Sequence, residues 1–323
     1  MAQHVRAVDV GTRSARAGIF APDGSMLSRE ICAFALSEHA GGLATYRFAD
    51  LWQAACTAVT QAVDSAGIAP QDIAGLAFDA TCSLVLTGPE GPLPLTKDGH
   101  DTIAWYDHRA VAEAAEITAT GHPLIAHLGG AMSPEMQTAK LLWLKRHRAD
   151  LWDRLVSARD LVDALTAKAT GRDAVSSSVL TTKWPWMPER NGWQTDLLSA
   201  IGLGDLPLPA SVKAPGTLAG PLCAEAARAM GLTEDTAVAI GMVDAYAGAL
   251  GVCDPSNPGL CLIAGTSNCV MSLSRTSTPT RGIWGPFPDA VLPGLVASEG
   301  GQSAAGAALD FVIDSWPGRE GAP

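Results

Sequence analysis

The chain has 323 residues, 47% of them hydrophobic and 17% charged, and 22 Lys and Arg against 33 Asp and Glu give a formal net charge of −11. This apolar content supports a sizeable core and argues against a disordered chain. The acidic balance, without a run of Lys or Arg, argues against partners such as nucleic acid or anionic lipid. The seven cysteines form no CxxC motif, and no membrane span or signal peptide is visible. A soluble, cytoplasmic protein of about two domains is predicted.

Elements in the first third are predicted to alternate between strand and helix. The expected elements are strands at 5–10, at 15–20 and from about Met26, a helix at 50–66 with Asp50 as N-cap and Gly67 as its end, and a buried strand at 73–80. The first three strands form an antiparallel meander in this interpretation.

The remaining elements continue the alternation. The expected elements are a helix that opens with Ser133 as N-cap and Pro134 at its first position, a helix at 160–171, a helix at 221–230 ended by Gly231, a buried strand at 236–245 and a helix at 303–313. This order predicts an α/β layer fold.

One long-range repeat links the two ends of the chain. Residues 7–20 and 260–273 both read as strand, Gly-Thr turn, strand, and the two Gly-Thr pairs are 254 positions apart (265 − 11). A tight turn of this kind presents N–H groups and a hydroxyl to a phosphate. Asp9 precedes the first turn and can meet a hydrated Mg²⁺, and Arg16 can donate to phosphate. The alternative is an ordinary hairpin with a capping threonine.

Three further residues are candidates for chemistry. Asp244 ends an apolar strand and is placed to take a proton from a substrate hydroxyl, although the spacing alone favours a helix N-cap. Lys183 and Glu299 are single charges in apolar or Gly-rich surroundings. They are either exposed surface residues or hydrogen-bond partners of a polar substrate such as a sugar.

Seven segments, in order along nearly the whole chain, resemble the FGGY family of carbohydrate kinases: VDVGTRSAR at 8–16, FDATCSL at 78–84, WYDHRA at 105–110, MSPEMQTAKLLWLK at 132–145, GMVDAYAG at 241–248, AGTSN at 264–268 and SEGGQSAAG at 298–306. The segment TCSL after FDA is similar to the branch that phosphorylates ribulose. The Arg-Glu pair of glycerol kinases and the Met-His pair of xylulose kinases are both absent from this position.

The resemblance implies two actin-like, ribonuclease H-like α/β lobes, with sugar bound mainly to the first and ATP to the second. The expected lobes are 1–245 and 246–323, the second of them incomplete. The resemblance also implies roles for single residues: Asp244 as general base, Asp9 with Mg²⁺, Gly11, Thr12, Arg16, Gly265, Thr266 and Ser267 around the phosphates, and Ala80, Thr81, Lys183 and Glu299 around the sugar.

The expected function is therefore ATP-dependent phosphorylation of a ketopentose, D-ribulose in the first place, with L-ribulose and xylulose as alternatives. One rival is a fragment that binds sugar but not nucleotide. Another is an actin-like ATPase with protein partners. Related kinases are often homodimers.

The length of the chain leads to one more expectation. A second lobe as large as the first needs on the order of 200 residues, but only 79 follow Asp244 (323 − 244). The chain is therefore expected to hold one complete lobe and the opening third of a second. Such an incomplete lobe is expected to expose apolar strand surface.

Overall fold

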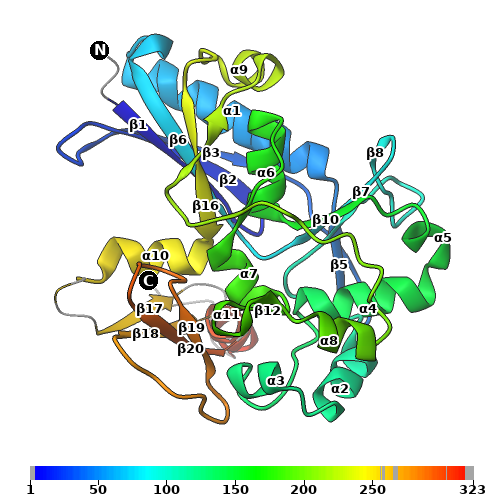
Figure 1. Cartoon of the computed structure of the whole chain (residues 1–323). Coiled ribbons are helices and arrows are strands. Elements are labelled where there is room, and N and C mark those ends of the chain that lie inside the picture. Colours follow the sequence, from blue (N-terminus) through cyan, green and yellow to red (C-terminus); the bar gives the residue numbers. More distant parts are fainter. Residues whose placement is uncertain (1–3, 255, 257–258, 265–267, 303, 317–323) are drawn as a thin grey trace. The chain divides into compact units, whose positions relative to one another are not determined.

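The fold is taken from a computed structural model, which describes residues 4–254, 256, 259–264, 268–302 and 304–316. The chain forms two compact units (Figure 1). Unit 1 comprises residues 1–122 and 131–244, and unit 2 comprises residues 123–130 and 245–323. Each unit has a β-sheet of its own.

Unit 1 is built on a six-stranded sheet whose strands lie in the order β15 (Leu218–Pro221), β16 (Ala237–Val243), β6 (Ile73–Ala80), β1 (His4–Val10), β2 (Ser14–Phe20) and β3 (Met26–Ala33). β1, β2 and β3 are antiparallel neighbours, as the sequence predicts. β6 lies parallel to β1 on one side and to β16 on the other. The three parallel strands therefore end at the same edge of the sheet.

Alternation of side chains along these strands makes one face of the sheet the core. Val8 and Val10 of β1 and Phe78 of β6 are 0–1% exposed. The helix α1 (Phe48–Ala66) packs on this face, where its Trp52 ring meets the ring of Phe78. Its C-terminus is the one predicted, because Gly67 adopts the left-handed conformation and donates to the last carbonyls.

The starts of two helices differ from the predictions. α1 begins at Phe48 after Arg47, so Asp50 lies inside the first turn and is not the N-cap. α4 (Gln137–His147) begins after Met136 rather than at Pro134. The Ser133 hydroxyl accepts the N–H of Glu135, and the Ser133 carbonyl accepts the N–H of Met136. The predicted capping residue therefore closes a separate turn before the helix.

The rest of unit 1 contains a second sheet, two short strand pairs and further helices. Its second sheet has the order β10 (Ser157–Asp160), β7 (Leu84–Gly88), β9 (Thr102–Ile103), β5 (Leu43–Tyr46) and β4 (Ser37–His39), with β8 (Gly91–Pro92) beside β7. Two short pairs join β11 (Val175–Ser176) to β14 (Val212–Lys213) and β12 (Trp186–Met187) to β13 (Gly192–Trp193). The other helices are α2 (Val111–Ala119), α5 (Ala149–Trp152), α6 (Leu161–Thr170), α7 (Ser177–Lys183), α8 (Thr195–Ala200) and α9 (Ala224–Met230), with single 3₁₀ turns at Pro70–Asp72 and Pro188–Arg190.

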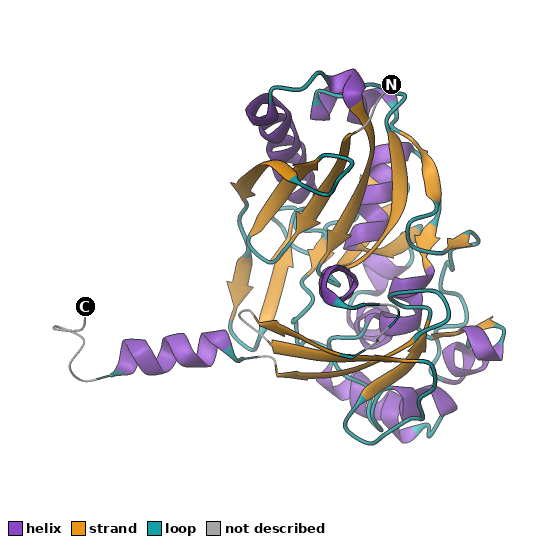
Figure 2. Ribbon diagram, turned by 90° about the vertical axis from the view of Figure 1, so that its left-hand side faces the viewer, coloured by secondary structure: helices purple, strands orange, loops and turns teal. Residues whose placement is uncertain are grey.

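Unit 2 has a four-stranded antiparallel sheet in the order β17 (Leu260–Ala264), β18 (Asn268–Ser274), β20 (Val296–Gln302) and β19 (Trp284–Pro288). Its helices are α3 (Pro123–His127), α10 (Asp244–Val252) and α11 (Gly306–Ser315). Figure 2 shows the helices and strands of the chain in separate colours. Leu260 and Leu262 of β17 are 78% and 63% exposed. This is apolar strand surface of the kind that the sequence predicts.

None of the helices in the described part of the chain is both long and apolar enough to cross a membrane.

Candidate functional site

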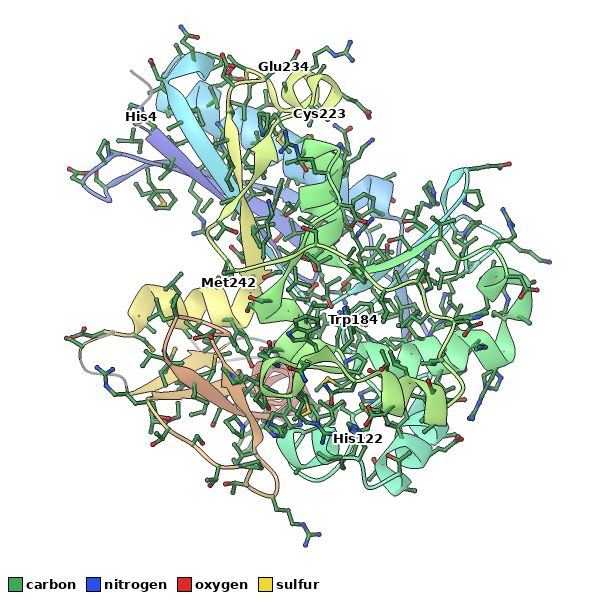
Figure 3. All side chains as sticks on the ribbon, in the orientation of Figure 1. His4, His122, Trp184, Cys223, Glu234 and Met242 are labelled. Carbon is green, nitrogen blue, oxygen red and sulfur yellow. The ribbon has the colours of Figure 1, made fainter. Side chains whose placement is uncertain are left out.

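Three aspartates meet at the edge where the parallel strands of unit 1 end. Asp9 of β1 lies opposite Asp79 of β6 in parallel register. On the other side of β6, Met242 of β16 lies opposite Asp79 (Figure 3 labels Met242), and Asp244 follows two residues later as the first residue of α10. The carboxyl ends of parallel strands in an α/β sheet are where ligands bind. The structure therefore brings Asp9 and Asp244 to one place, together with Asp79.

A glycine allows β16 to come this close. The register between β16 and β6 shifts between Ala239 and Met242, and Gly241 lies in that bulge. A Cβ at Gly241 would run into the carbonyl oxygen of Phe78 and lie 2.6 Å from the Cγ2 of Val162. Any larger residue would push the strand away, and Asp244 with it.

Asp79 is the functional candidate that the sequence reasoning missed. Its burial, then the charges of Asp9 and Asp244, and a hydrogen bond shared with Asp9 raise the pKa of Asp79 far above that of an ordinary carboxyl. A proton on Asp79 lets the two carboxyl groups share that hydrogen bond. The signal was present, because the strand at 73–80 ends in Asp-Ala as the strand at 5–10 ends in Asp-Val.

Arg16 faces Asp9 across the first hairpin. The two residues lie directly opposite in the antiparallel register of β1 and β2. Arg16 Nη1 donates to Asp9 Oδ2 over 2.6 Å, and the two side chains are 41% and 32% exposed. A guanidinium has five N–H donors, so this bond leaves Arg16 with further donors for an anion.

A backbone hydrogen bond closes the turn of the first hairpin. The N–H of Gly11 donates to the carbonyl of Ser14 over 3.0 Å. A Cβ at Gly11 would make only an ordinary contact, 3.6 Å from Arg16 Nη1, and Gly11 does not have a positive φ. The fold itself therefore does not require a glycine here. Close approach of a ligand to the backbone is the remaining physical reason for one.

The segment that follows β6 forms a buried polar floor in unit 1. Ala80 and Thr81 are 0% and 5% exposed. The N–H of Thr81 donates to the carbonyl of Val10 over 3.1 Å, and the hydroxyls of Thr81 and Ser83 are 3.1 Å apart. Two of the predicted sugar-binding residues are thus tied to the end of the strand that carries Asp9.

Asp160 extends this floor and has one oxygen without a donor. Its Oδ2 accepts Gln137 Nε2 over 2.9 Å and Trp184 Nε1 over 3.0 Å (Figure 3 labels Trp184). Its Oδ1 and the Oε1 of Gln137 are buried without a hydrogen-bond partner in the described structure. Burial raises the pKa of Asp160 to about 6, while the charges of Lys140 and Lys183 oppose that rise. Lys183, at the end of α7, therefore lies within the electrostatic reach of this floor.

Glu299 belongs to unit 2. It lies on β20, is 9% exposed, and both of its carboxylate oxygens accept a donor. The hydroxyl of Tyr246 donates to Oε2 over 2.8 Å, and the thiol of Cys269 donates to Oε1 over 3.3 Å. Glu299 is therefore a fixed, buried acceptor rather than the exposed surface charge of the alternative interpretation.

The second Gly-Thr turn is only bracketed by the structure. β17 and β18 pair as an antiparallel hairpin whose last pair is Ala264 with Asn268. The two strands predicted on either side of the second Gly-Thr pair are therefore present and antiparallel. The residues predicted to bind nucleotide there, Gly265, Thr266 and Ser267, lie outside the described residues.

The expected metal rests on Asp9. Over residues 4–254 and the described stretches after them, no group of three or more His, Cys, Asp and Glu could hold a metal ion. Mg²⁺ in phosphoryl-transfer sites commonly keeps several waters and uses only one or two carboxylates together with substrate phosphates. The part-exposed carboxylate of Asp9 fits a magnesium ion bound in that way.

Comparison with family models matches two descriptions. Residues 5–251 match the N-terminal domain of the FGGY family of carbohydrate kinases, and residues 260–322 match its C-terminal domain.

Individual proteins agree with the family models. The chain is 38% identical over 331 residues to an FGGY carbohydrate kinase domain-containing protein of Danio rerio, covering 95% of this chain and 60% of that protein. It is 33% identical over 355 residues to a D-ribulokinase of Saccharomyces cerevisiae, covering 96% of this chain and 50% of that protein. The chain thus spans about half to three fifths of the length of these relatives.

A solved structure supports the fold. The crystal structure of xylulose kinase from Rhodospirillum rubrum matches with a TM-score of 0.82 at 23% identity, covering 98% of this chain and 64% of that one. At this level of identity the match concerns the fold, which is the actin-like α/β fold expected from the sequence.

Proposed function

The chain belongs to the FGGY family of carbohydrate kinases, and from this premise we propose that it transfers the γ-phosphate of ATP to a hydroxyl of a ketopentose, with D-ribulose as the substrate. The observation that carries the proposal is the meeting of Asp9, Asp79 and Asp244 at one strand edge, beside the turn of Gly11 and Thr12. Phosphoryl transfer needs a positioned base next to a phosphate cradle. This edge supplies both.

Asp244 acts as the general base in this proposal. It accepts the proton of a terminal sugar hydroxyl while that oxygen attacks the γ-phosphorus in line. The bond from the γ-phosphorus to the bridging oxygen breaks, and ADP leaves. The position of Asp244 depends on β16, which Gly241 allows to lie against β6.

The two Gly-Thr hairpins hold the phosphates. We expect the N–H groups and hydroxyl of the first turn to bind phosphate and stabilise its charge, and we propose nucleotide phosphate binding for Gly265, Thr266 and Ser267 as well. Asp9 would hold Mg²⁺ through water, and the bound ion neutralises charge on the phosphate oxygens. Arg16 keeps Asp9 oriented through their ion pair.

In this proposal Ala80, Thr81 and Lys183 bind the sugar, and the carboxylate of Glu299 is a further acceptor for its hydroxyls. The likeness of residues 78–84 to the ribulose-specific branch supports D-ribulose, as does the name of the yeast relative. The second candidate function is sugar binding without nucleotide binding, which is favoured by the buried floor that the predicted sugar contacts Ala80 and Thr81 form within unit 1 alone.

The test is a coupled ADP-release assay over D-ribulose, L-ribulose and D-xylulose, with calorimetry for sugar and for MgATP. We expect the highest kcat/KM with D-ribulose, and a loss of about 10³-fold in Asp244→Asn because the general base is removed. Asp64→Asn, an exposed change on α1, is the matched control. Unchanged turnover in Asp244→Asn would refute the assigned base, and sugar binding without MgATP binding would favour the second candidate.

A further inference from the structure

Thr12, in the turn of the first hairpin, is held by two aromatic side chains from distant parts of unit 1. The indole Nε1 of Trp105 donates to the Thr12 hydroxyl over 3.1 Å. The hydroxyl of Tyr46 donates to the Thr12 carbonyl over 2.9 Å. Tyr46 is 1% exposed, so its side chain is an immobile support. The two bonds hold the main chain and the side chain of Thr12 separately.

The bond from Trp105 determines which way the threonine hydroxyl can act. An indole N–H donates and never accepts, so the Thr12 oxygen must be the acceptor. One lone pair of that oxygen is then occupied, and its own hydrogen points away from the indole. A hydroxyl prepared in this way is a donor, which is the form that an anionic phosphate oxygen requires.

Trp105 is held in turn by a buried lysine. Lys140 of α4 is 0% exposed, and its Nζ donates to the carbonyls of Ala104 over 2.9 Å and of Trp105 over 3.0 Å. Burial lowers the pKa of Lys140 to about 8, which is a cost to the folded state. Lys140 thus fixes the main chain that carries Trp105, while the ring packs edge-on against Tyr106 with centroids 5.2 Å apart.

We propose that Trp105 is a positioning residue of the phosphate-binding turn, which fixes the Thr12 hydroxyl as a donor toward a bound phosphate, and that Lys140 holds Trp105 in place. The inference rests on the proposed function for the presence of a phosphate at Thr12. It adds a role to two residues, Trp105 and Lys140, that do not themselves touch the phosphate.

The hydrogen bond is tested by nuclear magnetic resonance, without any need for catalysis. The Trp105 indole N–H resonance is identified by its loss in Trp105→Phe. We expect it to move upfield and to exchange faster with solvent in Thr12→Val, which removes the acceptor and keeps the shape. The same change is expected in Lys140→Met, and if that variant does not fold, Thr12→Val decides. An indole resonance that Thr12→Val leaves unchanged would overturn the inference.

The effect on phosphate is tested by a double-mutant cycle on the dissociation constant of MgATP. Trp105→Phe removes one hydrogen bond and is expected to weaken binding about fivefold in the natural chain. In the Thr12→Val background the same change is expected to have less than about a twofold effect, because its target is gone. A contact of Trp105 with the sugar would not produce this dependence on Thr12.

The control for the cycle is Trp186→Phe. The indole nitrogen of Trp186 is buried without a partner in the described structure, so this variant makes the same chemical change without removing a hydrogen bond. We expect it to leave the MgATP constant unchanged. Equal effects of Trp105→Phe in both backgrounds would overturn the inference. Failure of the natural chain to bind MgATP would instead contradict the proposed function, and the resonance test would still decide the hydrogen bond.

Discussion

The two Gly-Thr hairpins share a local pattern and differ in the burial of their first strands. Val8 of β1 is 0% exposed, whereas Leu262, at the equivalent position 254 residues later (8 + 254), is 63% exposed. Arg6 is 2% exposed, whereas its equivalent Leu260 (6 + 254) is 78% exposed. β1 therefore buries a charge and a valine at positions whose equivalents on β17 are exposed leucines.

Strand neighbours account for this difference. β1 has β6 on one side and β2 on the other, and helix α1 packs on the sheet. β17 is the edge strand of the described sheet of unit 2 and has only β18 beside it. The pattern of strand, Gly-Thr and strand therefore specifies the hairpin. The burial of β1 and the placement of Asp79 beside Asp9 both depend on β6, a parallel strand that is not part of the hairpin.

Matched truncations in the two hairpins test this difference most strongly. Val8→Ala is expected to lower the free energy of unfolding by about 2–3 kcal/mol, because a buried side chain leaves a cavity. Leu262→Ala is expected to change it by less than about 0.5 kcal/mol, because the lost side chain was mostly in water. Chemical denaturation measures both. Equal costs would mean that β17 is covered in solution.

The features that the sequence predicts correctly are those set by local contacts, and those that it misses depend on contacts between distant segments. The strand ending at Ala80 and the helix end at Gly67 were predicted correctly, because alternation and a left-handed glycine are local signals. The start of α4 was wrong, because the Ser133 hydroxyl closes a turn with Glu135 instead of capping a helix. Nothing in the local sequence separates these two uses of a serine.

The candidate site shows the same limit. Asp9 and Asp244 were identified through motifs, and the placement of their strands, β1 and β16, on either side of β6 was not predicted. Asp79 was missed because its role depends on parallel pairing with a strand about 70 residues away in sequence. Lys140 was missed because a lysine in a helix is ordinarily exposed. Its burial against the carbonyls of Ala104 and Trp105 is a tertiary contact.

The buried charge of Arg6 on β1 gives the next prediction. All three guanidinium nitrogens of Arg6 are buried without a hydrogen-bond partner in the described structure, and burial lowers the pKa of Arg6 to about 10. Arg6→Met is expected to raise the free energy of unfolding by about 2 kcal/mol, because it removes an unpaired buried charge and keeps the volume. Arg29→Met, an exposed change on β3, is the control. A destabilised Arg6→Met variant would show that the guanidinium has an acceptor in solution.

Buried carboxyls provide a second contrast between the units, and it depends on pH. Both oxygens of Glu299 accept a donor, whereas Asp160 Oδ1 has none. The pKa of Asp160 is about 6 in the folded chain, against about 3.9 when unfolded. Folding therefore takes up a proton, and stability is lost as the pH rises from about 4 to about 6.

Asp160→Asn removes this loss, because an amide does not ionise. We expect Asp160→Asn to be more stable than the natural chain by about 1–2 kcal/mol at pH 8. At pH 4, where Asp160 is protonated in the folded chain, the difference is expected to be small. Denaturation at both pH values measures this, with Asp64→Asn as control. A pH-independent difference would contradict the assigned titration.

The last prediction concerns the exposed leucines of β17. Its expected effect is the smallest, and it depends on protein concentration. An edge strand with unpaired N–H and C=O groups and apolar side chains is a surface on which chains associate. We expect the natural chain to associate as its concentration rises, and Leu262→Lys to reduce that association because it places a charge on the edge. Sedimentation velocity over a concentration series measures the effect. Val156→Lys is the control, because Val156 is an exposed apolar residue of unit 1 (54%) that lies outside the hairpins. If both variants reduce association equally, the added charge is responsible, and the exposure of β17 does not make the second hairpin a surface for association.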